Sequence, residues 1–147
     1  MSKVETGLRE ALRGVALRPT AQRLAVLKYL ARRPVHATAE EIFCAVNRTN
    51  PRASRATVYN NLRDLARSGL VREMVSEGRA SRFDARLRRH HHFVCEECGA
   101  IQDIAWFDLP PAAGKALLEG RTVRRYEIVF RGSCETCGPC NPPRGER

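Results

Sequence analysis

The sequence predicts an α+β protein of two small domains: a winged helix-turn-helix over residues 1–85, and an α/β domain with a four-cysteine zinc site over residues 90–140. Three observations lead to this prediction. Helical patterns fill the first half of the chain and are followed by two short strands. Two Cys-x-x-Cys pairs occur only in the second half. A short basic segment, residues 85–89, separates the halves, and its length indicates a hinge or short linker.

The composition is that of a basic globular protein. Of its 147 residues 43% are hydrophobic, which is enough for a modest core. The 26 Lys and Arg residues exceed the 16 Asp and Glu residues and give a formal net charge of +10. This excess favours nucleic acid as a partner, with a merely solubilising surface as the alternative. No stretch approaches the ~20 apolar residues of a bilayer span, so an integral membrane protein is not expected.

A short N-terminal helix is expected in the first half, over residues 8–12, followed by three helices that have start and stop signals. Thr20 follows Pro19 and can cap the second helix, which Pro34 ends. Thr38 and Glu41 form a capping box at the start of the third. The residues expected to face the core are Leu24, Leu27, Tyr29 and Leu30 in the second helix, and Ile42, Phe43 and Val46 in the third.

The fourth helix leads into a predicted hairpin. Ser54 is a typical N-cap residue, and Gly69 ends the helix just after Ser68. Residues 70–75 and 79–83 predict two antiparallel strands, with a turn at Glu77-Gly78. The last three of these four helices, followed by a hairpin, have the element order of a winged helix-turn-helix.

The fourth helix has two unlike faces. At ~100° per residue, Val58, Leu62 and Leu65 share an apolar face. The other face carries amide, guanidinium and phenol groups. Such a face suits the major groove, because these groups pair with base edges or pack on a thymine methyl. An ordinary solvated face is the alternative. The polar candidates are Thr57, Tyr59, Asn60, Arg63 and Arg67, and candidates for phosphate or minor-groove contact are Arg18, Arg79 and Arg82.

The cysteine pairs predict a structural zinc site. Cys95 and Cys98 form one Cys-x-x-Cys pair, Cys134 and Cys137 form the other, and Gly follows each. Two such pairs complete a tetrahedral thiolate site with no open position. A thioredoxin-like redox pair is the rival interpretation, which the second pair and the expected strands disfavour. We expect zinc to fasten the last strand of the second domain to its first.

The sequence also predicts the cellular compartment and the roles of the two remaining cysteines. Residues 1–10 lack the apolar segment of a secretory signal, which favours the cytoplasm. Thiols stay reduced there, and paired cysteines more often bind metal than form disulfides. Cys44 is expected to be a small buried apolar residue. Cys140 is expected to be a spare thiol in a Pro-rich tail, or an alternate zinc ligand if one of the four cysteines is oxidised.

Histidines and carboxylates predict a second metal site. In a strand leading into Cys95, His90 and His92 would point to one side and His91 to the other. Imidazoles combined with carboxylates suit a divalent ion. Taken singly, each candidate is more ordinarily a surface or turn residue. The further candidates are His36, Asp84 and Asp103.

Several motifs, in order, resemble the ferric uptake regulator family. They are Thr38-Ala39-Glu40-Glu41-Ile42, Thr57-Val58-Tyr59-Asn60-Asn61-Leu62, Ser81-Arg82-Phe83-Asp84 and the run from His90 to Gly99. The similarity extends over about residues 8–138. Within the family the chain looks most like the peroxide-sensing branch, because of Asp84 and the sequence Tyr59-Asn60-Asn61.

The resemblance implies a homodimeric repressor of a palindromic DNA operator. Residues 1–85 would be the DNA-binding domain and residues 90–140 the dimerisation and metal-binding domain. An Fe(II) or Mn(II) corepressor is implied. With iron bound, oxidation of a ligand histidine by peroxide would release the DNA, whereas the manganese form would respond poorly to peroxide. The implied ligands of this regulatory metal are His36, Asp84, His90, His92 and Asp103, and the implied DNA contacts are Arg18, Tyr59 and Asn60.

Other functional classes stay open at this point. One is a repressor that senses iron, nickel, manganese or zinc by occupancy, without redox chemistry. A metalloenzyme using the histidines is disfavoured, since no motif such as H-E-x-x-H is present, and we expect no enzyme. A zinc-ribbon RNA-binding protein is disfavoured by an aromatic content of only 6%.

Overall fold

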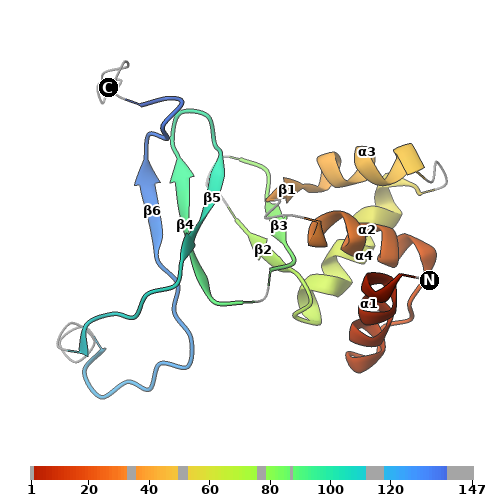
Figure 1. Cartoon of the computed structure of the whole chain (residues 1–147), viewed down its shortest axis with the longest axis horizontal. Helices are drawn as coiled ribbons and strands as arrows, with labels where there is room; N and C mark the ends of the chain where they lie inside the picture. Colours follow the sequence, from red (N-terminus) through yellow and green to blue (C-terminus); the bar gives the residue numbers. More distant parts are fainter. Residues whose placement is uncertain are drawn as a thin grey trace. The chain divides into compact units, whose positions relative to one another are not determined.

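The computed structural model of the chain describes residues 2–32, 36–49, 53–75, 79–86, 88–111 and 118–138. Its mixture of helices and sheets confirms the predicted α+β class. The chain divides into two compact units, Met1–Leu87 and Arg88–Arg147 (Figure 1). Within the described ranges, no helix combines the length and the apolar character needed to cross a bilayer.

The first unit contains four helices and a small sheet, and the second is described as a sheet. In chain order, the elements of the first are α1 (Lys3–Gly14), α2 (Ala21–Ala31), β1 (Ala37–Thr38), α3 (Ala39–Thr49), α4 (Arg55–Arg67), β2 (Arg72–Met74) and β3 (Arg82–Asp84). Those of the second are β4 (His90–Cys95), β5 (Ile101–Ala105) and β6 (Val129–Gly132). The predicted features at Pro34, Glu77-Gly78 and Cys140 lie outside the described residues.

The predicted helix caps are present. The Thr20 hydroxyl accepts from the Arg23 amide at the start of α2, and Ser54 accepts from the Thr57 amide at the start of α4. In the capping box, the Thr38 amide donates to Glu41 Oε2 at 2.7 Å, and the Glu41 amide donates to Thr38 Oγ1 at 3.2 Å. These bonds satisfy amides that have no partner inside a helix, so each helix begins at the predicted residue.

The first helix is longer than predicted. The α1 helix spans Lys3–Gly14 because Ser2 caps it, its hydroxyl accepting from the Glu5 amide. Arg9 donates to the Glu5 carboxylate one turn away at 3.0 Å. The expectation of residues 8–12 rested on the apolar positions alone and missed this polar first turn.

The core of the first unit is built from the predicted apolar faces. Val58, Leu62 and Leu65 of α4 are at most 1% exposed. The predicted leucines of α2, together with Ile42 and Val46 of α3, belong to the same core, and the predicted Tyr29 and Phe43 are partly buried against it. Because α4 buries this face, its opposite face is left for solvent or a partner.

The expectation for Cys44 is wrong. Its side chain is exposed. The α3 helix buries Ile42 and Val46, which lie one turn apart, and Cys44 lies midway between them in sequence. At 100° per residue this places Cys44 on the opposite side of the helix from the buried face.

The predicted hairpin is formed, and a third strand joins it. β2 and β3 pair antiparallel, with Glu73 opposite Phe83. β1, which has two residues, pairs with the other edge of β3, with Ala37 opposite Phe83. A strand this short has no alternating pattern for the sequence to reveal.

The second unit is organised around β4, the middle strand of a sheet with the order β5-β4-β6. β4 runs antiparallel to β5, with His92 opposite Asp103, and parallel to β6, with Cys95 opposite Gly132. The parallel pairing brings the carboxyl ends of β4 and β6 together. Cys95 is the last residue of β4 and Cys98 follows it, while Cys134 and Cys137 follow the end of β6.

Candidate metal centres and nucleic-acid interface

The four paired cysteines meet at the end of the second sheet. The Sγ atoms of Cys95, Cys98, Cys134 and Cys137 all lie within 4.8 Å of one another. Cys98 Sγ and Cys134 Sγ are 3.8 Å apart. Sulfurs placed tetrahedrally about 2.3 Å from zinc are about 3.8 Å apart, whereas a disulfide is about 2.05 Å long. The donor set and its spacing therefore fit one zinc ion.

Main-chain amides prepare one of these thiols for a cation. The amides of Cys98 and Cys134 donate to Cys95 and hold the pKa of its thiol at about 6. Without a metal, the neighbouring sulfur of Cys134 raises the pKa of the Cys137 thiol to about 12. Four thiolates this close together repel one another, and a dication is what stabilises them.

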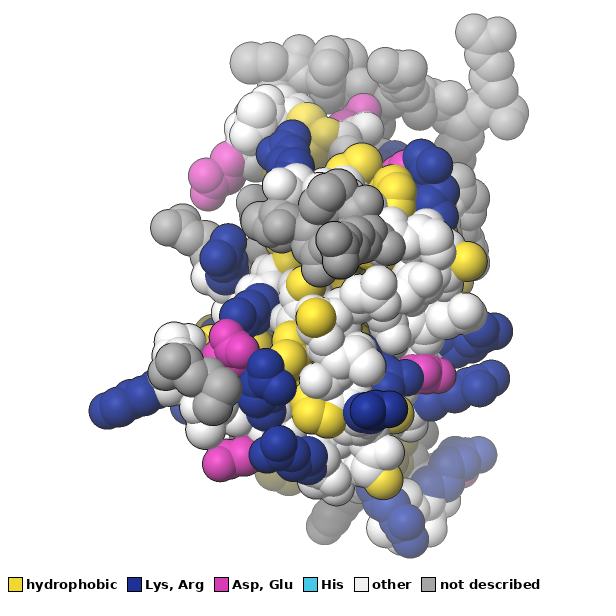
Figure 2. All heavy atoms as spheres, turned by 90° about the vertical axis from the view of Figure 1, so that its right-hand side faces the viewer, with side chains coloured by type: hydrophobic (Ala, Val, Ile, Leu, Met, Phe, Trp, Pro, Cys, Tyr) yellow, Lys and Arg dark blue, Asp and Glu magenta, His cyan; other side chains and the backbone are white. Residues whose placement is uncertain are grey.

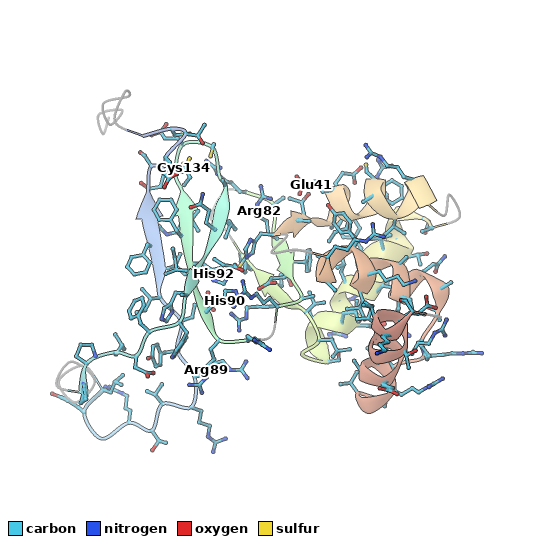
Figure 3. The ribbon with its side chains drawn as sticks, viewed as in Figure 1. Glu41, Arg82, Arg89, His90, His92 and Cys134 are labelled. Atoms are coloured by element: carbon cyan, nitrogen blue, oxygen red, sulfur yellow. The ribbon has the colours of Figure 1, made fainter. Side chains whose placement is uncertain are left out.

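His90, His92 and Asp103 converge at the middle of the sheet. As predicted for a strand, His90 and His92 point to one side of β4, and Figure 3 shows them at a distance from Cys134. His90 Nε2 lies 3.0 Å from His92 Nε2. Asp103 Oδ1 lies 3.5 Å from His90 Nε2 and 4.0 Å from His92 Nε2. All three side chains are largely buried, with exposed fractions of 4%, 1% and 11%.

The tautomers of both imidazoles follow from their other nitrogens. His90 Nδ1 donates to the Arg88 carbonyl at 2.7 Å, and His92 Nδ1 donates to Glu127 Oε1 at 3.1 Å. Because each Nδ1 carries the proton, each neutral ring has a lone pair on Nε2. Two lone pairs and a carboxylate oxygen therefore face one another, an arrangement that a bound cation stabilises. Adjacent ligands of an octahedral ion at about 2.1 Å are about 3.0 Å apart.

The remaining two candidate ligands lie together in the first unit. His36 directly precedes β1 and Asp84 ends β3, so the pairing of Ala37 with Phe83 brings them to the same end of that sheet. Both are buried. Arg82, labelled in Figure 3, donates to the His36 carbonyl at 2.7 Å, and the Arg86 amide donates to Asp84 Oδ1 at 2.7 Å. These bonds fix the backbone on both sides of the pair.

His91 has a structural place that the sequence did not reveal. It is fully buried and stacks on Trp106, with ring centroids 4.5 Å apart. The Ile128 amide donates to its Nδ1 at 3.2 Å, so the proton is on Nε2, which donates to the Phe107 carbonyl at 3.0 Å. Both nitrogens are thus used by the main chain, and His91 is not part of the cluster on the other side of β4.

The predicted DNA-contacting face of α4 is exposed. Tyr59 is 50% exposed, Asn60 and Arg63 are exposed, and Thr57 is half-buried. Arg63 Nη2 donates to Asn60 Oδ1, so these two side chains form one unit on the surface. Figure 2 views the molecule from the right-hand side of Figure 1 and shows more Lys and Arg than Asp and Glu side chains. Such a surface suits a polyanion.

The exposed Arg18 is connected to α4 through one residue. The Arg23 guanidinium donates to the Arg18 carbonyl at 3.2 Å and to Asp64 Oδ2 of α4 at 2.6 Å. These two bonds hold the backbone of Arg18 at a fixed place beside α4. The sequence had no signal for this link, since Asp64 lies 41 residues from Arg23.

Glu127 is the residue near the histidines that the sequence did not point to. It lies just before β6, and its contact with His92 depends on the parallel register of β4 with β6. Register of this kind is set by tertiary packing, so no local pattern could have revealed it.

Comparison with known proteins adds an independent finding. The model of the ferric uptake regulator family matches residues 14–120. The chain is 38% identical to the peroxide operon regulator of Bacillus subtilis, over 87% of this chain and 89% of that one. It is 36% identical to the peroxide-responsive repressor PerR of Staphylococcus aureus, over 86% of each.

Solved structures agree. The Campylobacter jejuni peroxide stress regulator has a TM-score of 0.66 and 28% identity, covering 93% of this chain and all of that one (100%). The ferric uptake regulator of Helicobacter pylori has a TM-score of 0.71 at 21% identity, covering 90% of this chain and 89% of that one. The latter likeness establishes the fold.

Proposed function

The chain belongs to the ferric uptake regulator family, and from this we propose that it is a metal-dependent, peroxide-responsive transcriptional repressor. The similar repressors of Bacillus subtilis and Staphylococcus aureus support this assignment. We place its action in the cytoplasm, on operator DNA. On this assignment it regulates transcription and is not an enzyme.

One observation carries the metal dependence. The Nε2 lone pairs of His90 and His92 and the Asp103 carboxylate face one another inside the second unit. Their nitrogen and oxygen donors suit Fe(II) or Mn(II), while the four cysteines suit a structural zinc. We propose that His36 and Asp84 complete the regulatory site, so that one ion holds the two units in a single arrangement.

This arrangement would set the distance between recognition helices in a dimer. A dimer binds two half-sites that must match the spacing of its helices, and hence a palindromic operator. In the described part of the second sheet, β6 is an edge strand, and its Val129 and Phe130 are each 41% exposed. An exposed apolar edge of this kind supports pairing with a second copy of the chain.

The DNA would be contacted by the exposed face of α4 and by the loop before α2. The contacting residues would be Thr57, Tyr59, Asn60 and Arg63 of α4, together with Arg18.

Peroxide sensing would act through the ligand histidines. Bound Fe(II) would supply the redox chemistry: one oxygen atom of hydrogen peroxide would be added to a ring carbon of a ligand imidazole, and the other would leave as water, a two-electron oxidation of the ring by the peroxide. We expect the oxygen on His36 or His90. An oxidised ring is a weak ligand, so the two units lose their common attachment and the DNA is released.

Mass spectrometry combined with operator binding tests this function. The protein is loaded with Fe(II) or with Mn(II), treated with hydrogen peroxide, and digested. We expect a mass increase of one oxygen on a His-containing peptide, together with loss of operator binding, with iron and not with manganese. Metal-dependent operator binding without added oxygen would instead support a sensor of metal occupancy. Operator binding that is unchanged by chelation would contradict both.

A further inference from the structure

The Glu127 carboxylate lies against the outer nitrogen of a candidate metal ligand, His92. Its Oε1 accepts from His92 Nδ1 at 3.1 Å. The His92 side chain is 1% exposed, and that of Glu127 is 33% exposed. A hydrogen bond between a buried imidazole and a carboxylate fixes both the ring's orientation and its tautomer.

We propose that Glu127 is a positioning residue for the regulatory cation, a role that rests on the proposed function. It holds the proton on His92 Nδ1 and thereby presents Nε2 as the ligand atom. The negative charge next to the ring also makes Nε2 a stronger donor. His90 differs, because its Nδ1 donates to the neutral Arg88 carbonyl. The two histidines thus differ in strength as ligands, and His92 is the stronger.

The geometry distinguishes Glu127 from a ligand. It lies at Nδ1 of His92, whereas Asp103 and His90 lie at Nε2. The two nitrogens are on different sides of the ring, so a cation at Nε2 is not within reach of the Glu127 carboxylate. Glu127 therefore acts through His92.

The backbone next to Glu127 is anchored to β4, which keeps its carboxylate in place. The Ile128 amide donates to His91 Nδ1 at 3.2 Å, and the His92 amide donates to the Ile128 carbonyl at 3.1 Å. Tyr126 accepts from the Leu109 amide at 3.0 Å. Because the backbone directly after Glu127 is held against β4, the carboxylate loses less conformational freedom when it binds the imidazole.

The test compares Glu127→Gln with the wild-type protein and with Glu119→Gln. The control makes the same change of charge at an exposed position in the same unit. Long-range ¹H–¹⁵N spectra of the zinc-loaded protein without Mn(II) report the tautomer of His92. Titration with Mn(II) then reports the affinity of the histidine site.

We expect the wild type to show a proton on His92 Nδ1. Glu127→Gln should bind Mn(II) about 10- to 100-fold more weakly. An amide can either donate or accept, so His92 in this variant should show a mixture of tautomers. Glu119→Gln should behave as wild type, and Glu127→Asp, which keeps the carboxylate, should recover part of the affinity.

Two results would overturn the proposal. One is a wild-type His92 protonated on Nε2. The other is a folded Glu127→Gln protein that binds Mn(II) as tightly as the wild type. A different result would overturn the proposed function. If wild-type His92 has the expected tautomer but the protein takes up no Mn(II), the proposed function is wrong, and so is the metal-binding part of this inference.

Discussion

Asp103 lies directly opposite His92 in the paired strands β5 and β4, with its Oδ1 4.0 Å from His92 Nε2 and 3.5 Å from His90 Nε2. Residues opposite each other in an antiparallel pair project to the same face of the sheet. The carboxylate therefore joins the two imidazoles through strand register alone. The sheet holds the three donors together before any ion binds.

Asp103→Asn should weaken Mn(II) binding while leaving the fold intact. The amide has the shape of the carboxylate but lacks its charge. A contact to a charged group contributes about 1.5–3 kcal/mol, so we expect affinity to fall by about tenfold or more. Mn(II) titration measures the effect. Asp108→Asn is the matched control, because the amide oxygen can still accept from Trp106 Nε1. Equal affinities in the two variants would contradict the assignment of Asp103.

Cys134→Ser should abolish zinc binding and unfold the second unit. Zinc binding contributes roughly 10–16 kcal/mol in small zinc domains, which equals or exceeds the typical 5–15 kcal/mol stability of a whole domain. Metal analysis should give one zinc per wild-type chain and none in the variant, with loss of the amide protection of β4 to β6. Cys44→Ser, which changes an exposed cysteine, should keep its zinc. A folded, zinc-free Cys134→Ser protein would show that the site is dispensable.

Local chemistry was sufficient to predict where α2, α3 and α4 begin and which cysteines form the zinc site. The caps at Thr20, Thr38 and Ser54 are satisfied within three residues of each cap. Each Cys-x-x-Cys pair is likewise a local turn, such as the one in which the Cys137 amide donates to the Cys134 carbonyl. Interactions of this range depend on the neighbouring sequence and little on the rest of the fold.

The sequence could not predict contacts that depend on strand register, nor which side of a helix is buried. β1 is only two residues long, and the contact of Glu127 with His92 spans 35 residues. Cys44 lies among apolar residues in sequence but on the exposed side of α3, because the buried face follows Ile42 and Val46. Alternation along β4 correctly predicted that His91 points to the opposite side of the strand from His90 and His92. It could not predict the partners of His91, because Phe107 and Ile128 come from other parts of the chain.

Asn60→Ala and Arg63→Ala should each weaken operator binding. A side chain that contacts a base edge contributes about 1–3 kcal/mol, or roughly 5- to 150-fold in affinity. Because Arg63 donates to Asn60, the loss in the double variant should be smaller than the sum of the two single losses. Fluorescence anisotropy with operator DNA and with a mutated half-site measures affinity and specificity. The control is Arg13→Ala, which removes an exposed charge from α1 and should have little effect on operator binding. If Arg13→Ala weakened binding as much as Arg63→Ala, the contribution of Arg63 would be purely electrostatic.

His91→Phe should destabilise the second unit without weakening Mn(II) binding. The phenyl ring can still stack on Trp106, but the Ile128 amide loses the acceptor that it now has at 3.2 Å. A buried polar group left without a partner costs about 1–3 kcal/mol. His92→Phe should instead weaken Mn(II) binding more than it lowers stability, because it removes Nε2 from the cluster. Denaturant unfolding and Mn(II) titration of the two variants separate these effects. An equal loss of Mn(II) affinity in both would place His91 in the metal site, against the use of both its nitrogens by the main chain.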